Sequence, residues 1–130
     1  MHSNQDDLQM DVKKNNINNI LPALFQPFSL RNITFKNRIF VSPMCQYCAD
    51  DGHVNVDWHF AHHGRFALSG VGGAMVEASG ITRNGRITHS CLGIYKDSHI
   101  KNLSKIVSIY HSQNIRQCFF IIIIMLKALS

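Results

Sequence analysis

Short apolar runs alternate with helical patterns along the middle of the chain. Ile39, Phe40 and Val41 form an apolar run too short for a helix, and Pro43, which lacks a backbone N–H, stops it. We therefore predict a strand over residues 38–41. The small and apolar residues at 72–78 predict a second strand. Unbroken runs of this kind are typical of strands buried on both faces in a parallel sheet, where ligands lie at the carboxyl ends of the strands.

Two amphipathic patterns follow these strands. The first begins near Asp57, which we expect to cap a helix, and ends at Ser69 and Gly70. The second follows Asp97 or Ser98, either of which could cap it. Its apolar positions have helical spacing: Ile100, Leu103, Ile106, Val107 and Tyr110.

The remaining segments are predicted as a hairpin and loops. Two short apolar pieces flank the polar pair Arg31 and Asn32, which predicts a hairpin over residues 24–35. Residues 49–53 have the composition of a turn, and residues 79–93 that of a long loop. The order is hairpin, β, α, β, α, which is typical of parallel βα units with right-handed crossovers.

Composition indicates one soluble globular domain. The chain has 130 residues, of which 45% are hydrophobic and 16% charged. Its 13 Lys and Arg exceed its 8 Asp and Glu, which gives a formal charge of +5, but no basic run of five residues occurs. Because nucleic-acid binding needs a clustered cationic surface, we expect no nucleic-acid partner.

The cysteines and the amino terminus favour a cytoplasmic protein. Four cysteines occur, at 45, 48, 91 and 118, and no apolar signal segment opens the chain. Free thiols in a reducing compartment are therefore expected rather than a disulfide framework. Residues 1–22 are mostly polar and are predicted to form a disordered leader.

The end of the chain is strongly apolar. Residues 118–126 are nine consecutive apolar residues, fewer than the ~20 that a membrane helix needs, so we expect no membrane anchor. The β-branched content also fits a buried third strand. A further alternative is an out-of-frame or intron-derived segment, and we describe residues 115–130 as an aberrant apolar tail.

Cysteines and histidines also suggest a metal site. Cys45 and Cys48 are followed by His59 and His62, with ten residues between the pairs and two between the histidines. Zinc fingers usually have ~12 and three to five residues there, so we predict no metal. A redox dithiol is disfavoured as well, because the cysteine pair follows a proline and does not open a helix.

Ordered motifs in the chain resemble one family. They are residues 24–28, 36–39, 42–47, 57–59 with His62, 73–79, 85–88 and 92–95. Together they resemble the amino-terminal end of old yellow enzyme-type flavin oxidoreductases, in the class that has cysteine after Ser42, Pro43 and Met44. The resemblance implies an α/β fold, the amino-terminal portion of a (β/α)8 TIM barrel. Such barrels need roughly 250 residues, so residues 23–114 supply a hairpin and about two βα units of an incomplete barrel.

The resemblance also implies a function and a site. The implied activity is FMN-dependent, NAD(P)H-driven reduction of an activated alkene, as in NADPH dehydrogenases and ene reductases, and the full-length proteins could be homo-oligomers. By the same resemblance Tyr47 contacts substrate, and no residue present is assigned a catalytic role. The residues implied to line the flavin are Ser42, Pro43, Met44, Cys45 and Ala78.

Structural interpretations remain open beside these. Cys45 could be an inert thiol, and Tyr47 could only close the barrel rim. Arg38 and Glu77 are better explained as a structural ion pair than as catalytic groups. Two hypotheses follow: the chain is the amino-terminal part of an FMN-dependent ene reductase and is inactive alone, or it is a degenerate, truncated product that binds no flavin.

Overall fold

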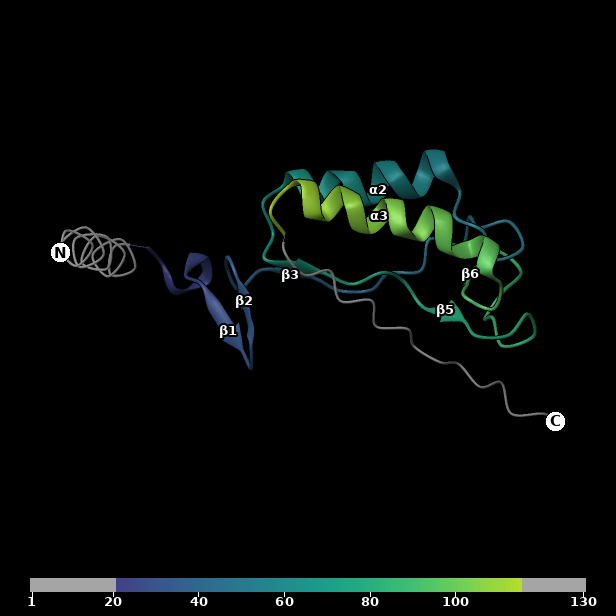
Figure 1. Cartoon of the computed structure of the whole chain (residues 1–130), viewed down its shortest axis with the longest axis horizontal. Helices are drawn as coiled ribbons and strands as arrows, with labels where there is room; N and C mark the ends of the chain where they lie inside the picture. Colours follow the sequence, from purple (N-terminus) through teal and green to yellow (C-terminus); the bar gives the residue numbers. More distant parts are fainter. Residues whose placement is uncertain (1–20, 116–130) are drawn as a thin grey trace, which may run out of the picture.

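A computed structural model describes residues 21–115 (Figure 1). The predicted leader and the predicted apolar tail therefore lie almost entirely outside the described residues. Within residues 21–115 the strands form three two-stranded sheets, and two long helices pack over them. None of the helices in this range is long and apolar enough to cross a membrane.

The predicted hairpin is confirmed. After a short 3-10 turn, Ala23–Phe25, strand β1 (Phe28–Leu30) pairs antiparallel with β2 (Ile33–Phe35). Arg31 takes the turn with φ of 53°. Phe35 is buried and meets the Phe40 ring edge-on at 4.8 Å between centroids, which fixes the hairpin against the start of the next strand.

A parallel pair forms the centre of the strand layer. Strand β3 (Phe40–Val41) pairs with β4 (Gly73–Ala74), and the Met75 N–H extends the ladder by donating to the Val41 carbonyl at 3.0 Å. The parallel arrangement is as predicted. Strand β3 ends where predicted but begins two residues later, and β4 is shorter than the predicted 72–78. Pro43 has no N–H with which to continue the pairing beyond the end of β3.

The predicted loop at 79–93 is partly wrong. Its two ends are strands, β5 (Ser79–Gly80) and β6 (Leu92–Gly93), which pair parallel to one another. Glycine is depleted in strands, so the local pattern carried no signal for this pairing. The predicted turn at 49–53 is confirmed: Asp51 and Gly52 have φ of 42° and 84°, and Asp50 and His53 bridge across it.

The two predicted helices are present, but their caps differ from those expected. Helix α2 (Val56–Leu68) is capped by Asn55, whose side chain accepts from the Trp58 N–H at 3.0 Å, whereas Asp57 lies inside the first turn. The Asn55 backbone is extended, which lets its side chain reach back to the turn that follows.

Helix α3 (Ile100–Ser112) has no side-chain cap. A 3-10 turn, Asp97–His99, leads into it, and the His99 N–H donates to the Lys96 carbonyl at 3.0 Å. The expected cap at Asp97 or Ser98 is therefore wrong, because the tightened turn supplies the backbone acceptor itself.

The core lies between the helices and the strands. Figure 1 shows α2 and α3 lying side by side along one face of the strand layer. The buried apolar side chains come from both layers: Ala67, Val71, Ala74, Val76, Leu92, Leu103, Ile106, Tyr110 and Ile115. Within residues 21–115 the sheet does not close, so the described chain is an open α/β unit.

A buried histidine joins the two helices. His63 of α2 is 3% exposed, and its Nδ1 lies 2.9 Å from the Tyr110 hydroxyl of α3. Burial, which disfavours the charged imidazolium, lowers the pKa of His63 to about 4. The helix pair is therefore most stable when this side chain is neutral.

We expect stability to fall with acidification through this residue. An unfolded histidine has an ordinary pKa of about 6.5, so below that pH the unfolded chain binds the extra proton first and the free energy of unfolding decreases. The loss should reach roughly 3 kcal/mol by about pH 4. In urea unfolding followed by circular dichroism, His63→Gln should flatten this dependence, and the exposed His111→Gln should not. An equal slope in both variants would contradict the assignment.

Candidate active site

The carboxyl ends of β3 and β4 bring predicted site residues together. Because the two strands are parallel, residues 42–46 and 75–78 leave the sheet at the same edge. Val41 pairs with Ala74, so Cys45 and Ala78 reach this edge together, and the Ala78 backbone offsets part of the rise in the pKa of the Cys45 thiol. Two residues that were predicted to line one site from separate motifs thus lie at the same edge.

Beside this contact lie exposed side chains. Met44 is 43% exposed and Tyr47 is 50% exposed, while Cys45 is half-buried. Tyr47 has φ of 52°, in the left-handed region that costs a non-glycine residue energy. Ser42 and Pro43 complete the segment between β3 and these groups.

The thiol and the phenol are both held in their neutral forms. Burial, followed by the charge of Glu77, raises the pKa of Cys45. The nearby Cys45 group, more than burial, raises the pKa of Tyr47. At neutral pH the edge therefore presents two weak hydrogen-bond donors next to an apolar methionine side chain.

The predicted ion pair between Arg38 and Glu77 is wrong. Glu77 is 3% exposed and pairs with His59, whose Nε2 lies 3.0 Å from Glu77 Oε1. Arg38 instead lies over the Phe28 ring at 5.8 Å. Arg38 precedes β3 and Glu77 follows β4, so in a parallel pair they lie at opposite ends of the sheet.

Cys48 contacts only one of the two helix histidines of the considered metal site. Cys48 Sγ lies 3.9 and 3.8 Å from His59 Nδ1 and Nε2. His62 packs edge-on against Phe66 at 5.0 Å between centroids. Among residues 21–115 no group of three His, Cys, Asp or Glu side chains is placed to hold a metal ion.

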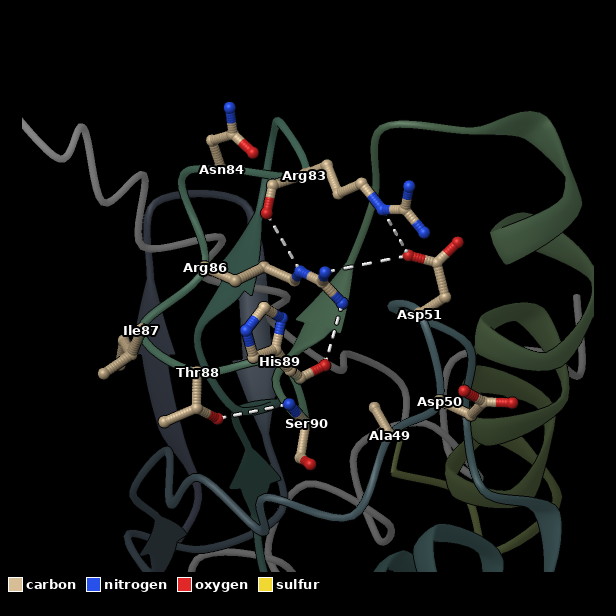
Figure 2. A pocket seen from close by; sticks show the side chains of 10 residues that line it. All are labelled: Ala49, Asp50, Asp51, Arg83, Asn84, Arg86, Ile87, Thr88, His89 and Ser90. Carbon is tan, nitrogen blue, oxygen red and sulfur yellow. Dashed lines mark hydrogen bonds and ion pairs between the residues drawn. The ribbon is translucent and has the colours of Figure 1, made fainter. Parts of the chain in front are cut away.

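A polar cavity of about 840 Å³ lies beside this edge (Figure 2). Its walls are the turn after Cys48 and the loop between β5 and β6. The lining residues are Ala49, Asp50, Asp51, Arg83, Asn84, Arg86, Ile87, Thr88, His89 and Ser90. Sequence analysis did not identify it, because nothing in residue spacing indicates that these two loops meet. Of the predicted site residues only Ala78 lies near, in a small adjoining pocket with Gly80 and Arg86.

Asp51 is the shared acceptor for the cationic side chains around this cavity. Its carboxylate accepts from Arg83 Nε at 2.9 Å and from Lys96 Nζ at 2.8 Å, with Arg86 Nη2 at 3.7 Å and the Tyr95 hydroxyl at 3.1 Å. Figure 2 shows both guanidinium groups pointing toward this carboxylate. The hydrogen bond from Lys96, followed by that from Arg83, holds the pKa of Asp51 far below its usual range.

The arginines of the cavity are used within the protein. Arg86 also donates from Nε to the Arg83 carbonyl at 3.0 Å and from Nη1 to the His89 carbonyl at 2.9 Å. These bonds fold the loop back on itself, and Asp51 joins it to the turn. We therefore assign this cluster the role of fixing the loop geometry around the site.

The open βα arrangement, with a thiol and a phenol at the carboxyl ends of parallel strands, is that of a piece of a TIM-barrel oxidoreductase. The family model described as the NADH:flavin oxidoreductase / NADH oxidase family matches residues 23–126. The chain belongs to this family. The match extends beyond residue 114, where the predicted domain ended.

Relatives of known sequence agree with this membership. An NADPH dehydrogenase from Bacillus cytotoxicus is 46% identical over 87 residues, which cover 65% of this chain and 25% of the relative. An NADH:flavin oxidoreductase from Gibberella zeae is 42% identical over 91 residues, which cover 70% of this chain and 22% of the relative. The chain thus spans about a quarter of the length of the curated relatives it matches.

Solved structures agree on the fold. The old yellow enzyme from Trypanosoma cruzi superposes with a TM-score of 0.70 at 24% identity, over 78% of this chain and 26% of the other. A crystal structure of TcOYE with pHBA gives 0.69 at 26% identity, over 77% and 27%. The predicted fold class, an amino-terminal portion of a TIM barrel, is confirmed.

We expect Asp51→Ala to loosen the loop at 81–90. Arg83 and Lys96 would lose their shared acceptor, so trypsin should cut faster after Arg83 and Arg86, as measured by mass spectrometry of timed digests. Asp57→Ala, which removes an exposed carboxylate elsewhere, serves as the control. Equal cleavage rates in both variants would show that the charge cluster around Asp51 does not hold the loop in place.

The ion pairs between Asp51 and the loop at 81–90 should weaken in acid. The pKa of Asp51 is lowered on folding, so its contribution to stability is present above the ordinary aspartate pKa of about 3.9 and is lost as the pH falls below it. Trypsin is inactive at such a low pH, so the measurement is hydrogen exchange of the backbone amides of the loop at 81–90. Wild-type protection should decrease there, and Asp51→Ala should show no further decrease.

Proposed function

We propose that the carboxyl edge of β3 and β4 is one wall of the active site of an FMN-dependent NAD(P)H oxidoreductase that reduces activated alkenes. The observation that carries the proposal is that the register of the parallel pair brings Cys45 and Ala78 to the same edge, beside the exposed Tyr47. Family membership and the names of the NADPH dehydrogenase relatives support the flavin and NAD(P)H parts of this proposal.

The residues present fit the edge of a flavin ring. An isoalloxazine ring has an apolar face and an edge of carbonyl and nitrogen acceptors, so a wall for it needs apolar surface beside weak donors. Met44 offers exposed apolar surface, and Cys45 offers a neutral thiol. The backbone of residues 42–45 and of Ala78 would lie along the same edge.

The described residues fit the flavin phosphate less well. A phosphate needs arginine or free backbone N–H groups. Arg83 and Arg86, the arginines of the cavity, are already engaged by Asp51 and by loop carbonyls. We infer that the phosphate would be held by barrel segments other than residues 21–115.

FMN, when bound, would accept a hydride from NAD(P)H and deliver it to the activated alkene. The chain's own residues would then orient the partners. Tyr47 would donate its hydroxyl proton in a hydrogen bond to the substrate carbonyl, which it can do because its raised pKa keeps the phenol protonated. Cys45 would hold its thiol against the ring edge, and Met44 would exclude water from that edge.

We expect the 130-residue chain alone to retain little or no FMN through gel filtration, because it lacks a phosphate site in the described range. A chimera of residues 23–114 with the remaining barrel of the Bacillus cytotoxicus NADPH dehydrogenase should bind FMN and oxidise NADPH. The measurements are flavin absorbance per protein and NADPH consumption with an activated alkene. The unaltered Bacillus enzyme is the control. A folded chimera without flavin would support the alternative of a chain that binds none.

Two variants of the chimera should separate the roles of the thiol and the phenol. Cys45→Ala should shift the flavin reduction potential and leave flavin bound, because a group beside the ring tunes it without holding it. Tyr47→Phe should weaken substrate binding or oxidative turnover by roughly 1–3 kcal/mol, since a carbonyl partner is left unsatisfied. Spectroelectrochemistry and stopped-flow kinetics measure the two effects. An unchanged potential in Cys45→Ala would return that cysteine to a structural role.

A further inference from the structure

A buried carboxylate lies beneath the half-buried thiol and the exposed phenol. Glu77 is 3% exposed, and each of its oxygens serves a different segment of the chain. Oε1 lies 3.0 Å from His59 Nε2 on α2, and Oε2 accepts from the Gln46 backbone N–H at 2.9 Å. A carboxylate removed from water costs several kcal/mol unless it is hydrogen-bonded in this way, so the two contacts must be kept together.

The amide that Glu77 holds belongs to the residue between Cys45 and Tyr47. The Gln46 side chain adds two further bonds: Nε2 donates to the Met44 carbonyl at 2.8 Å, and Oε1 accepts from Trp58 Nε1 at 3.0 Å. Tyr47, next in the chain, has the left-handed φ of 52°. A strained backbone of this kind persists only where its surroundings determine it, and the bonds to Gln46 do so.

His59 connects this arrangement to the start of α2. It is fully buried, and its Nδ1 lies 3.0 Å from the Asn55 N–H and 3.1 Å from the Asn55 carbonyl. The Asn55 backbone can therefore bond the ring in two ways. Its N–H can donate to an unprotonated Nδ1, and its carbonyl can accept from an Nδ1 that carries a proton. In both cases Nε2 keeps its proton for Glu77, so the pair stays connected.

We propose that Glu77, oriented by His59, is a positioning residue that sets the place of the Cys45 thiol and the Tyr47 phenol through the Gln46 amide, and that its carboxylate also acts on the thiol by its charge. Where it concerns flavin and substrate, this inference rests on the proposed function. The placement of the two groups themselves needs no bound ligand.

The electrostatics agree with the geometry. The charge of Glu77 contributes, after burial, to the raised pKa of Cys45 and of Cys48, and it contributes in the same direction to that of Tyr47. Replacing the carboxylate by an amide keeps an oxygen that can accept from the Gln46 N–H but removes the charge, so the pH dependence of the thiol reports whether Glu77 acts on Cys45 by its charge. Protection of the Gln46 amide reports whether Glu77 holds the segment in place.

The test is alkylation of Cys45 by iodoacetamide in the 130-residue chain across a pH series, followed by peptide mass spectrometry. In Glu77→Gln the profile should move to lower pH, with several-fold faster reaction at about pH 8, because loss of a nearby negative charge favours the thiolate. Asp57→Asn removes an equal charge from an exposed position and should leave the profile in place. Gln46→Ala keeps the amide bonded to Glu77 and should shift the profile less than Glu77→Gln does.

A second measurement needs no variant and stands if Glu77→Gln does not fold. In the wild-type chain the Gln46 amide should exchange with deuterium about tenfold more slowly than the Tyr47 amide, since only the former is bonded to a buried acceptor. Equal exchange of the two amides would overturn the proposal. So would an unmoved alkylation profile in a Glu77→Gln chain that keeps its helical circular dichroism.

The two proposals can fail separately. If the thiol profile and the amide exchange behave as expected but the chimera binds no FMN, the positioning role of Glu77 is supported and the proposed flavin site is contradicted. If the chimera binds FMN and turns over, while Glu77→Gln changes neither the alkylation profile of Cys45 nor the flavin reduction potential, the proposed flavin site is supported and Glu77 has a structural role only.

Discussion

The carboxylate of Glu77 joins three segments that are distant in sequence. It extends from the chain that leaves β4, reaches His59 on α2, and accepts the Gln46 amide after β3. Because an unpartnered buried charge is so costly, a shift of any one segment would leave the carboxylate with an unmet bond. The relative placement of strand, helix and loop is therefore held at one buried point, immediately below the surface that carries the thiol and phenol.

Close approach of the two central strands sets the register that makes this possible. A Cβ on Gly72 would lie 2.2 Å from the Asn37 carbonyl oxygen, and one on Gly73 would lie 2.6 Å from the Phe40 ring. Asn37 also donates to the Gly70 carbonyl at 2.8 Å and accepts from the Ile39 N–H at 3.1 Å. With β4 seated this tightly against β3, the two strands end level, and Cys45 and Ala78 reach the same edge.

The carboxyl edge carries two regions with different roles. The first, around Cys45 and Tyr47, is exposed, partly apolar and supplied with neutral donors, which suits contact with a ring and a carbonyl. The second is the cavity around Asp51, where cationic side chains are bonded to the protein itself. The match to the NADH:flavin oxidoreductase family, over residues 23–126, includes both regions.

Local patterns in the sequence determined the hairpin, the two central strands and the two helices, because burial periodicity and the bonding limits of proline and glycine act over a few residues. They also placed Cys45 beyond the end of the first central strand, whereas Ala78, predicted as the last residue of the second, lies beyond the end of β4 at Ala74. They did not determine whether Asn55 or Asp57 caps α2, since both side chains can accept and only the backbone direction decides which one reaches. The pairing of β5 with β6, the choice of His59 rather than Arg38 as the partner of Glu77, and the meeting of Asp51 with the loop at 81–90 were decided by tertiary structure alone. Each of these contacts joins residues 13 to 35 positions apart, and which charges and edges meet over such separations depends on how helices and strands pack, which no local pattern records.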